Sequence, residues 1–220
     1  MIFPFTFKMK NYFTIDYETN GLNPYYNQII EVAIKKIGTE NHYQSLVQPK
    51  QTIPIHGYVT PKIVSITGIT NEMILESGVP EDVATFNTLQ YISNNVPDDD
   101  SPIYLLAHNG NGFDFIFLRR YIRDYNRNNE VQLNQSIIDR IQFIDTLLVA
   151  KTYLKNEYVN QPGLCKKYNI VNEAEHRALG DVLALEKLFS VMCQQKSLIQ
   201  GKLRNYYFEH PEILIDELFI

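Results

Sequence analysis

Three short runs of apolar and β-branched residues open the chain and predict strands. Residues 12–15 are aromatic or β-branched, as is typical of a strand, and the Asn-Gly pair at 20–21 is typical of a turn. The next two runs, 28–37 and 42–47, are separated by the short segment 38–41. Two such runs joined by a short turn favour an antiparallel hairpin, so we expect three antiparallel strands at the start of the fold.

Further along the chain, strand-like runs alternate with helical patterns. Apolar residues recur three positions apart in segment 80–94, which predicts an amphipathic helix. Runs 103–107 and 141–145 are typical of short buried strands, and a helix is expected after the turn at 110–112. Further helices are expected at 61–65, 71–76, 146–153, 162–168 and 173–192. Strands that alternate with helices indicate a mixed α/β fold in layers.

Composition narrows the class of protein. A chain of 220 residues with 45% hydrophobic and 20% charged residues can bury a sizeable core and favours one globular domain. We expect this domain at 1–195, with its core at 11–192, and a C-terminal appendage of the same domain at 196–220. No apolar run approaches the ~20 residues that span a bilayer, so we expect no membrane association. Two cysteines give no disulfide framework, so an intracellular location, cytoplasmic by default, is expected.

The net charge argues against non-specific binding of nucleic acid but does not exclude an enzyme that acts on nucleic acid. The formal net charge of −5 argues against a blanket of positive charge that would hold nucleic acid non-specifically. A cluster of carboxylates that binds metal ions would itself contribute to such a total, so an acidic chain can still act on nucleic acid.

Acidic residues stand at the ends of predicted elements in a pattern that suits metal binding. Asp16 and Glu18 lie two positions apart at the end of the first strand, so both carboxylates point to the same side. Two like charges this close favour a hard divalent cation, which prefers oxygen ligands. Asp114 stands at the start of a helix behind a buried strand. Taken singly, these residues are better explained by a solvated turn or by a carboxylate at a helix N-terminus.

His176 and Asp181 lie five positions apart at the start of the last long helix. On a regular helix this spacing separates them by about 140° around the axis. They can share a site only if His176 lies on a loop or on a frayed first turn. The conjunction of the acidic pair, Asp114 and this His-x-x-x-x-Asp segment, rather than any one of them, indicates a common site.

This order of residues resembles the three motifs of the DnaQ-like, or DEDDh, 3'-5' exonuclease family. The segments are FTIDYETNGL at 13–22, AHNGNGFDF at 107–115 and HRALGDVLAL at 176–185. The TGIT segment at 67–70 adds secondary support, whereas Asn20 and Thr67 replace the Thr and His that are usual there. The resemblance implies a ribonuclease H-like, three-layer α/β fold whose central mixed five-stranded sheet, with its first three strands antiparallel, is flanked by helices.

The resemblance also implies a reaction and a set of roles. The family uses two metal ions per site, Mg²⁺ with Mn²⁺ as a substitute, to hydrolyse a phosphodiester bond. By this resemblance Asp16, Glu18 and Asp181 would bind the first ion, and Asp16 would bridge to a second ion held with the help of Asp114. His176 would be the general base, since the pKa of an imidazole lies near working pH.

Six further residues are candidates for contacts with the substrate. The resemblance implies that Thr19 and Leu22 hold the 3' nucleotide, by its hydroxyl and by an apolar wedge against the base. Asn109 and Phe113 border the second motif, although a turn cap and a core aromatic explain them equally well. Ile69 is a candidate for packing on a base, with core packing as the alternative, and Arg177 is a candidate for a phosphate contact.

The sequence therefore predicts a metal-dependent enzyme that removes nucleoside 5'-monophosphates from the 3' end of a single strand, with DNA slightly favoured. The alternatives are an RNA-trimming 3'-5' exoribonuclease and a non-catalytic nucleic-acid-binding or polymerase-associated module. Five intact ionisable positions argue against the module, because clustering them costs repulsion. Single-stranded DNA or RNA 3' ends are the expected partners. The tail at 196–220 is expected to form a short helix that covers the core, and a contact with a polymerase or with a second copy in a homodimer is the alternative.

Overall fold

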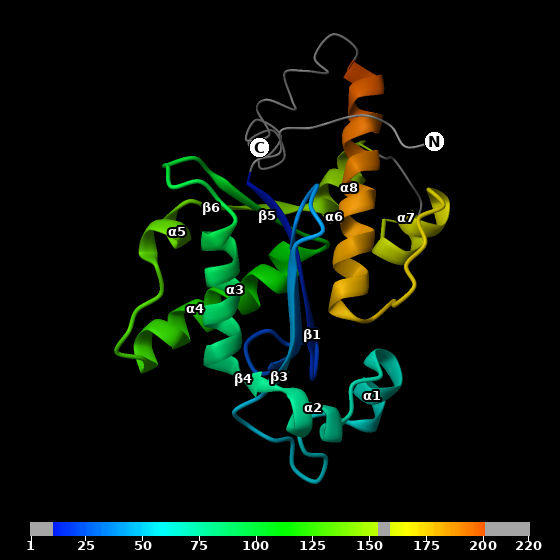
Figure 1. Ribbon diagram of the computed structural model, residues 1–220. Coiled ribbons are helices and arrows are strands. Elements are labelled where there is room, and N and C mark those ends of the chain that lie inside the picture. Colours follow the sequence, from blue (N-terminus) through cyan, green and yellow to red (C-terminus); the bar gives the residue numbers. More distant parts are fainter. Residues whose placement is uncertain (1–10, 154–158, 201–220) are drawn as a thin grey trace.

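A six-stranded mixed sheet lies at the centre of the computed structural model, which describes residues 11–153 and 159–200 (Figure 1). Its strands are β1 (Tyr12–Thr19), β2 (Ile29–Lys36), β3 (His42–Gln48), β4 (Val79–Pro80), β5 (Ile103–Ala107) and β6 (Ile141–Asp145). They lie in the order β4-β3-β2-β1-β5-β6. The first three are antiparallel, as predicted, whereas β5 pairs parallel with both β1 and β6.

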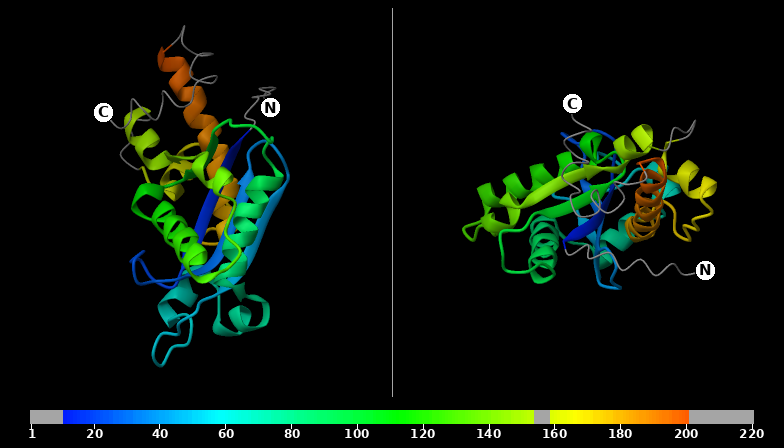
Figure 2. Two further views of the ribbon diagram at one scale, coloured as in Figure 1. Left: turned by 90° about the vertical axis from the view of Figure 1, so that its left-hand side faces the viewer. Right: turned by 90° about the horizontal axis from the view of Figure 1, so that it is seen from above.

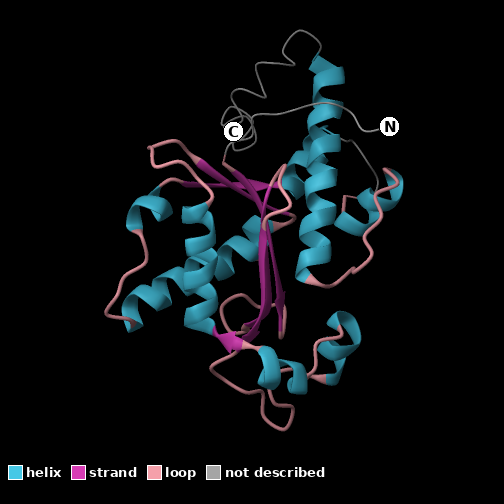
Figure 3. Ribbon diagram, viewed as in Figure 1, coloured by secondary structure: helices cyan, strands magenta, loops and turns pink. Residues whose placement is uncertain are grey.

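Helices cover both faces of this sheet (Figures 2 and 3). They are α1 (Pro61–Thr67), α2 (Asn71–Ser77), α3 (Glu81–Asn94), α4 (Asp114–Asn128), α5 (Gln135–Asp139), α6 (Thr146–Tyr153), α7 (Gln161–Lys167) and α8 (Ala178–Gln200), with the short 3-10 helix η1 (Gly110–Gly112) before α4. One core cluster joins the sheet to α3, α4 and α5, and a second joins the opposite face to α6, α7 and α8. The predicted three-layer α/β fold is confirmed.

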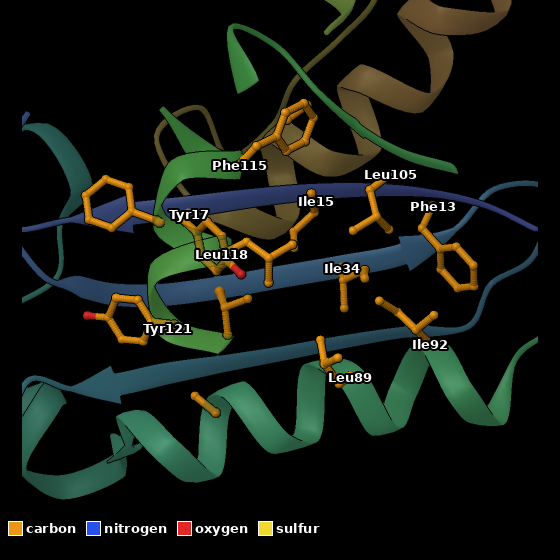
Figure 4. Packing of buried hydrophobic residues seen from close by; sticks show 14 of the residues in the cluster. Phe13, Ile15, Tyr17, Ile34, Leu89, Ile92, Leu105, Phe115, Leu118 and Tyr121 are labelled. Carbon is orange, nitrogen blue, oxygen red and sulfur yellow. The ribbon is translucent and has the colours of Figure 1, made fainter. Parts of the chain in front are cut away.

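Strand β1 sends alternate side chains to the two faces. Phe13, Ile15 and Tyr17 are buried in the core formed with α3 and α4 (Figure 4). Because side chains alternate along a strand, Asp16 and Glu18 point to the other face, which α8 covers. Because its side chains alternate between the two faces, β1 contributes residues to the hydrophobic core on one face and the acidic pair on the other.

Two boundaries differ from the sequence-based expectations. The sheet has a sixth strand that was not predicted: β4 is only two residues long and pairs parallel with β3, so it has no period that a sequence could reveal. Helix α8 begins at Ala178 rather than at 173, because residues 173–177 form a turn.

At its other end, helix α8 continues to Gln200 and so passes through position 195, where the appendage was expected to begin. The division of the chain into 1–195 and 196–220 stays a prediction, since residues 201–220 lie outside the described part of the chain. Across the described ranges, no helix combines the length and the apolar character needed to cross a membrane.

Candidate active site

Three carboxylates meet where β1 faces the first turn of α8. One oxygen from each of Asp16, Glu18 and Asp181 lies within 4.8 Å of the others, and all three side chains are half-buried. Two come from the same face of β1, and the third comes from a helix that packs across that strand. Oxygen ligands from carboxylates are the donors that hard divalent cations prefer, so this set fits such an ion.

Asp114 is a fourth carboxylate beside this cluster. It is the first residue of α4, is almost fully buried, and accepts a hydrogen bond of 3.1 Å at Oδ1 from the backbone N–H of Tyr17. The bond fixes its side chain against β1, next to Asp16. The charge of Asp114 is among the causes that raise the pKa of Asp16.

Burial raises the pKa values of all four carboxylates, and repulsion between neighbouring carboxylates adds to this for Asp16 and Glu18. Loss of solvent is the largest cause for each group, and the neighbouring carboxylates come next for Asp16 and Glu18. The pKa of Glu18 rises from 4.5 to about 8, and that of Asp114 rises from 3.8 to about 7. For Asp181 the direction is also upward. Such a set resists full ionisation by itself, and a cation would relieve the repulsion.

Asp181 is held by three donors from the chain before α8. Its Oδ1 accepts bonds of 2.8 Å from Asn172 Nδ2 and 3.1 Å from Gln161 Nε2, and its Oδ2 accepts one of 3.1 Å from the backbone N–H of His176. No pattern in the sequence indicated Asn172 or Gln161, because their part in the site depends on how the turns around α7 fold back onto α8.

His176 lies on the turn before α8, as a site shared with Asp181 requires. Its backbone is left-handed, with φ of 63°, and its side chain is about half exposed. Nε2 lies 3.8 Å from Glu175 Oε1. The imidazole is close enough to Asp181 to act as one of the influences that lower the pKa of that carboxyl. The turn therefore places the histidine beside the carboxylates while leaving its ring open to solvent.

The loop after β1 combines a buried threonine with an exposed leucine. Thr19 is buried, and its hydroxyl donates a 2.8 Å bond to the carbonyl of Gly21. Leu22 is 85% exposed, as a side chain that contacts a substrate would be. Asn20 bonds to the backbone at Gln28 and at Tyr58, so it fixes the loop.

Asn109 and Phe113 flank η1 at the end of β5. Asn109 has a left-handed backbone with φ of 69°, and its N–H donates a 3.0 Å bond to Asp145 Oδ1. Phe113 is half-buried and packs edge-on against Phe117, with ring centroids 5.0 Å apart. Phe113 thus packs as a core aromatic, whereas Asn109 lies in a turn without a capping bond from its side chain. Phe113 directly precedes Asp114 in the chain.

Ile69 and Arg177, two of the residues predicted to contact the substrate, contact other residues of the protein instead. Ile69 has no exposed surface and packs in a core cluster with Ile30, so it presents nothing to a base. The guanidinium of Arg177 binds the buried carboxylate of Glu31, with Nη2 to Oε1 at 2.6 Å and Nε to Oε2 at 3.1 Å. Arg177 is therefore engaged with the protein, and Glu31 is a residue that the sequence analysis missed.

A mixed sheet with four carboxylates and a histidine gathered at β1 and α8 defines a class of metal-dependent hydrolases that act on nucleic acids. The comparison with known families agrees: the exonuclease family model, RNase_T, matches residues 13–189. The chain therefore belongs to this exonuclease family, whose members are DnaQ-like and depend on divalent metal ions.

Similar proteins include both polymerases and a separate exonuclease. The chain is 28% identical over 192 residues to the PolC-type DNA polymerase III of Thermotoga petrophila, covering 84% of this chain and 12% of the polymerase. It is 32% identical to the exonuclease DPD1, chloroplastic/mitochondrial, of Arabidopsis thaliana, covering 79% of this chain and 53% of that protein. The chain thus spans about an eighth of the first relative and about half of the second.

Solved structures share the fold. Exonuclease I of E. coli in complex with a dT13 oligonucleotide superposes with a TM-score of 0.69 at 18% identity, covering 91% of this chain and 44% of that one. The zinc-bound form of the same exonuclease with single-stranded DNA superposes with a TM-score of 0.66 at 20% identity, covering 91% of this chain and 43% of that one. At these identities the likeness establishes the fold.

Proposed function

We propose that this protein is a metal-dependent 3'-5' exonuclease that releases nucleoside 5'-monophosphates from the 3' end of single-stranded nucleic acid, with DNA favoured over RNA. The observation that carries the proposal is the meeting of Asp16, Glu18 and Asp181 within 4.8 Å, with Asp114 and His176 beside them. The relatives named above include DNA polymerases, and the fold is that of an exonuclease bound to a DNA oligonucleotide, which supports DNA as the substrate.

In this proposal the carboxylates hold two Mg²⁺ ions, with Mn²⁺ as a substitute. Asp16, Glu18 and Asp181 would hold one ion, and Asp16 and Asp114 would help to hold the other together with the substrate phosphate. When bound, the ions would supply stabilisation of the charge that develops on the attacking and the leaving oxygen of the phosphodiester. The raised pKa values of Glu18 and Asp114 explain why the four groups need cations to be ionised together near neutral pH.

His176 acts as the general base. Its half-exposed imidazole accepts a proton from a water molecule as the water oxygen forms a bond to phosphorus. The bond between phosphorus and the 3' oxygen of the preceding nucleotide breaks, and that oxygen takes up a proton to become the new 3' hydroxyl. The products are a nucleoside 5'-monophosphate and a strand one nucleotide shorter.

Thr19 and Leu22 contact the terminal nucleotide. The exposed Leu22 side chain stands three residues beyond Thr19 on a loop that begins at the acidic pair, so an apolar contact there falls next to the reacting phosphate. Asn109 and Phe113, on either side of η1 and near Asp114, contact the penultimate nucleotide.

A polymerase is the partner that we propose for this enzyme. The relatives include a PolC-type polymerase and the epsilon subunit of DNA polymerase III from Rickettsia typhi, which is 25% identical over 182 residues, covering 80% of this chain and 70% of the subunit. The alternative partner is a second copy of this chain in a homodimer. Measuring the oligomeric state with and without a polymerase distinguishes the two partners.

End-blocked substrates test the direction and the sugar. Matched DNA and RNA single strands, each with phosphorothioate linkages at the 3' end, at the 5' end or at neither, are incubated with Mg²⁺. We expect protection by the 3' block alone, 5'-monophosphates as products, and faster loss of DNA. Protection by the 5' block alone contradicts the direction, and faster loss of RNA assigns the enzyme to RNA trimming.

A further inference from the structure

The turn that carries His176 is joined to the sheet through one buried carboxylate, that of Glu31 on β2. Its Oε2 accepts a 3.1 Å bond from Nε of Arg177 and a 2.9 Å bond from the backbone N–H of Ala178. Its Oε1 accepts a 2.6 Å bond from Nη2 of Arg177. The two residues that directly follow His176 are therefore both bonded to the same side chain. A planar guanidinium that makes two bonds to one carboxylate fixes orientation as well as distance.

Glu31 occupies a costly position. Its carboxylate has no exposed surface, and the residue lies directly opposite Glu18 in the β1–β2 register. Its charge raises the pKa of both Asp16 and Glu18, so it adds to the repulsion in the cluster. Since a buried ion pair is often no more stabilising than apolar residues of the same size, stability alone does not account for this pair.

The backbone of His176 is fixed on its other side as well. Its N–H donates to Asp181 Oδ2 at 3.1 Å. Its backbone φ of 63° lies in a region that residues other than glycine seldom adopt. Asn172 accepts a 3.2 Å bond from the N–H of Ala174 and itself donates to Asp181. In contrast, the imidazole is about half exposed. The backbone of the histidine is thus held on both sides while its ring can still turn.

We propose that Glu31 and Arg177 form a positioning pair for His176. The pair holds the turn 174–178 against β2 so that the imidazole begins each cycle beside the carboxylate cluster. Neither residue contacts the substrate or moves a proton. This inference rests on the proposed function, in which His176 is the general base, and it adds two residues through which that base acts.

Arg177→Lys is the first variant for the test, because it keeps a positive charge next to the buried Glu31 but cannot make the two-point bond. Glu31→Gln combined with Arg177→Met removes both charges together, so that no unpaired charge stays buried. Arg140→Lys is the matched control. Its guanidinium is bonded to the carbonyl of Ser101 at 2.8 Å, at the opposite ends of β5 and β6 from the acidic site.

Turnover is measured on a single-stranded oligonucleotide, with Mn²⁺ affinity by calorimetry and thermal unfolding beside it. For Arg177→Lys and for the double variant we expect kcat to fall by about 10- to 100-fold, as misplaced catalytic groups typically cause. KM is expected to stay unchanged, and so is the Mn²⁺ affinity of Arg177→Lys. Arg140→Lys should turn over like the wild type. If the double variant does not fold, Arg177→Lys alone carries the test.

The deciding readout is the same substitution in a His176→Ala background, assayed by long incubation at high enzyme concentration. A pair that acts through the imidazole has nothing left to position, so no further loss of turnover is expected there. An equal loss in both backgrounds, or full turnover of Arg177→Lys with the histidine present, overturns the pair's role alone. A wild-type protein that shows no metal-dependent hydrolysis overturns the proposed function and this inference together.

Discussion

Replacing Glu18 by glutamine should stabilise the metal-free protein at alkaline pH. The side chain lies within 4.8 Å of two other carboxylates, and burial together with those neighbours raises its pKa to about 8. Glutamine has nearly the same shape but no charge, so the substitution removes the repulsion and leaves the packing of β1 in place. The same change removes one ligand from the proposed metal site.

The direction of the pH effect follows from proton binding. Between pH 4.5 and about 8 the folded protein holds a proton on Glu18 that the unfolded chain has lost. The free energy of unfolding of the wild type therefore falls as pH rises through this interval, at no more than about 1.4 kcal/mol per pH unit. The whole interval amounts to at most about 5 kcal/mol, and partial exposure of the side chain reduces this to about 2–4 kcal/mol.

Urea unfolding at pH 5 and at pH 8, with a chelator present, measures this difference. We expect the two proteins to be nearly equal at pH 5 and Glu18→Gln to be more stable by about 2–4 kcal/mol at pH 8. Saturating Mn²⁺ should stabilise the wild type and not the variant. Glu130→Gln, at an exposed position, is the control and should change nothing. A wild type whose stability is flat or rising between pH 5 and pH 8 would show that the pKa of Glu18 is not raised in the folded protein.

Four further substitutions separate the parts of the site. Asp181→Asn should weaken Mn²⁺ binding at least about tenfold in calorimetry, because it removes a charged ligand; unchanged affinity would contradict its place in the cluster. His176→Ala should lose about 10²- to 10⁴-fold in turnover while Mn²⁺ and oligonucleotide binding persist, and undiminished turnover would rule it out as the base. Leu22→Ala should raise KM with the unfolding free energy within about 0.5 kcal/mol of wild type, since the side chain is 85% exposed. Gly110→Ala should cost about 1–3 kcal/mol in urea unfolding, because a Cβ there would lie 2.4 Å from the Phe115 ring.

Much of the fold could be predicted because its elements carry local patterns. The strands β5 and β6 and the helix α6 have the bounds that their apolar runs indicated. Helix α8 was predicted to begin too early, since its true start depends on a bond from the Ala178 N–H to Glu31, 147 positions away. Strand β4 was missed because two residues that pair through the backbone carry no pattern.

The site residues also fall into those that local patterns predicted and those that only the fold reveals. The period of a strand placed Asp16 and Glu18 on one side, and the turn before α8 gave His176 the position that the spacing to Asp181 demanded. For Arg177 the sequence suggested a phosphate contact. Its bond to the buried Glu31 was missed, because Glu31 lies 146 positions away and no local pattern indicates the contact. Local periods predict which side chains share a face, whereas partners from distant segments require the fold.

In the proposed function, the carboxylate cluster hydrolyses nucleic acid from the 3' end with the help of divalent ions. A time course on a 5'-labelled single-stranded DNA and its matched RNA, with Mg²⁺, with Mn²⁺ or with a chelator, tests it beside an Asp16→Asn variant. We expect a ladder of 5'-labelled products that shortens one nucleotide at a time, requires the metal, and is absent in the variant. A strand that stays intact with either metal while the protein still binds it would contradict the proposed exonuclease activity.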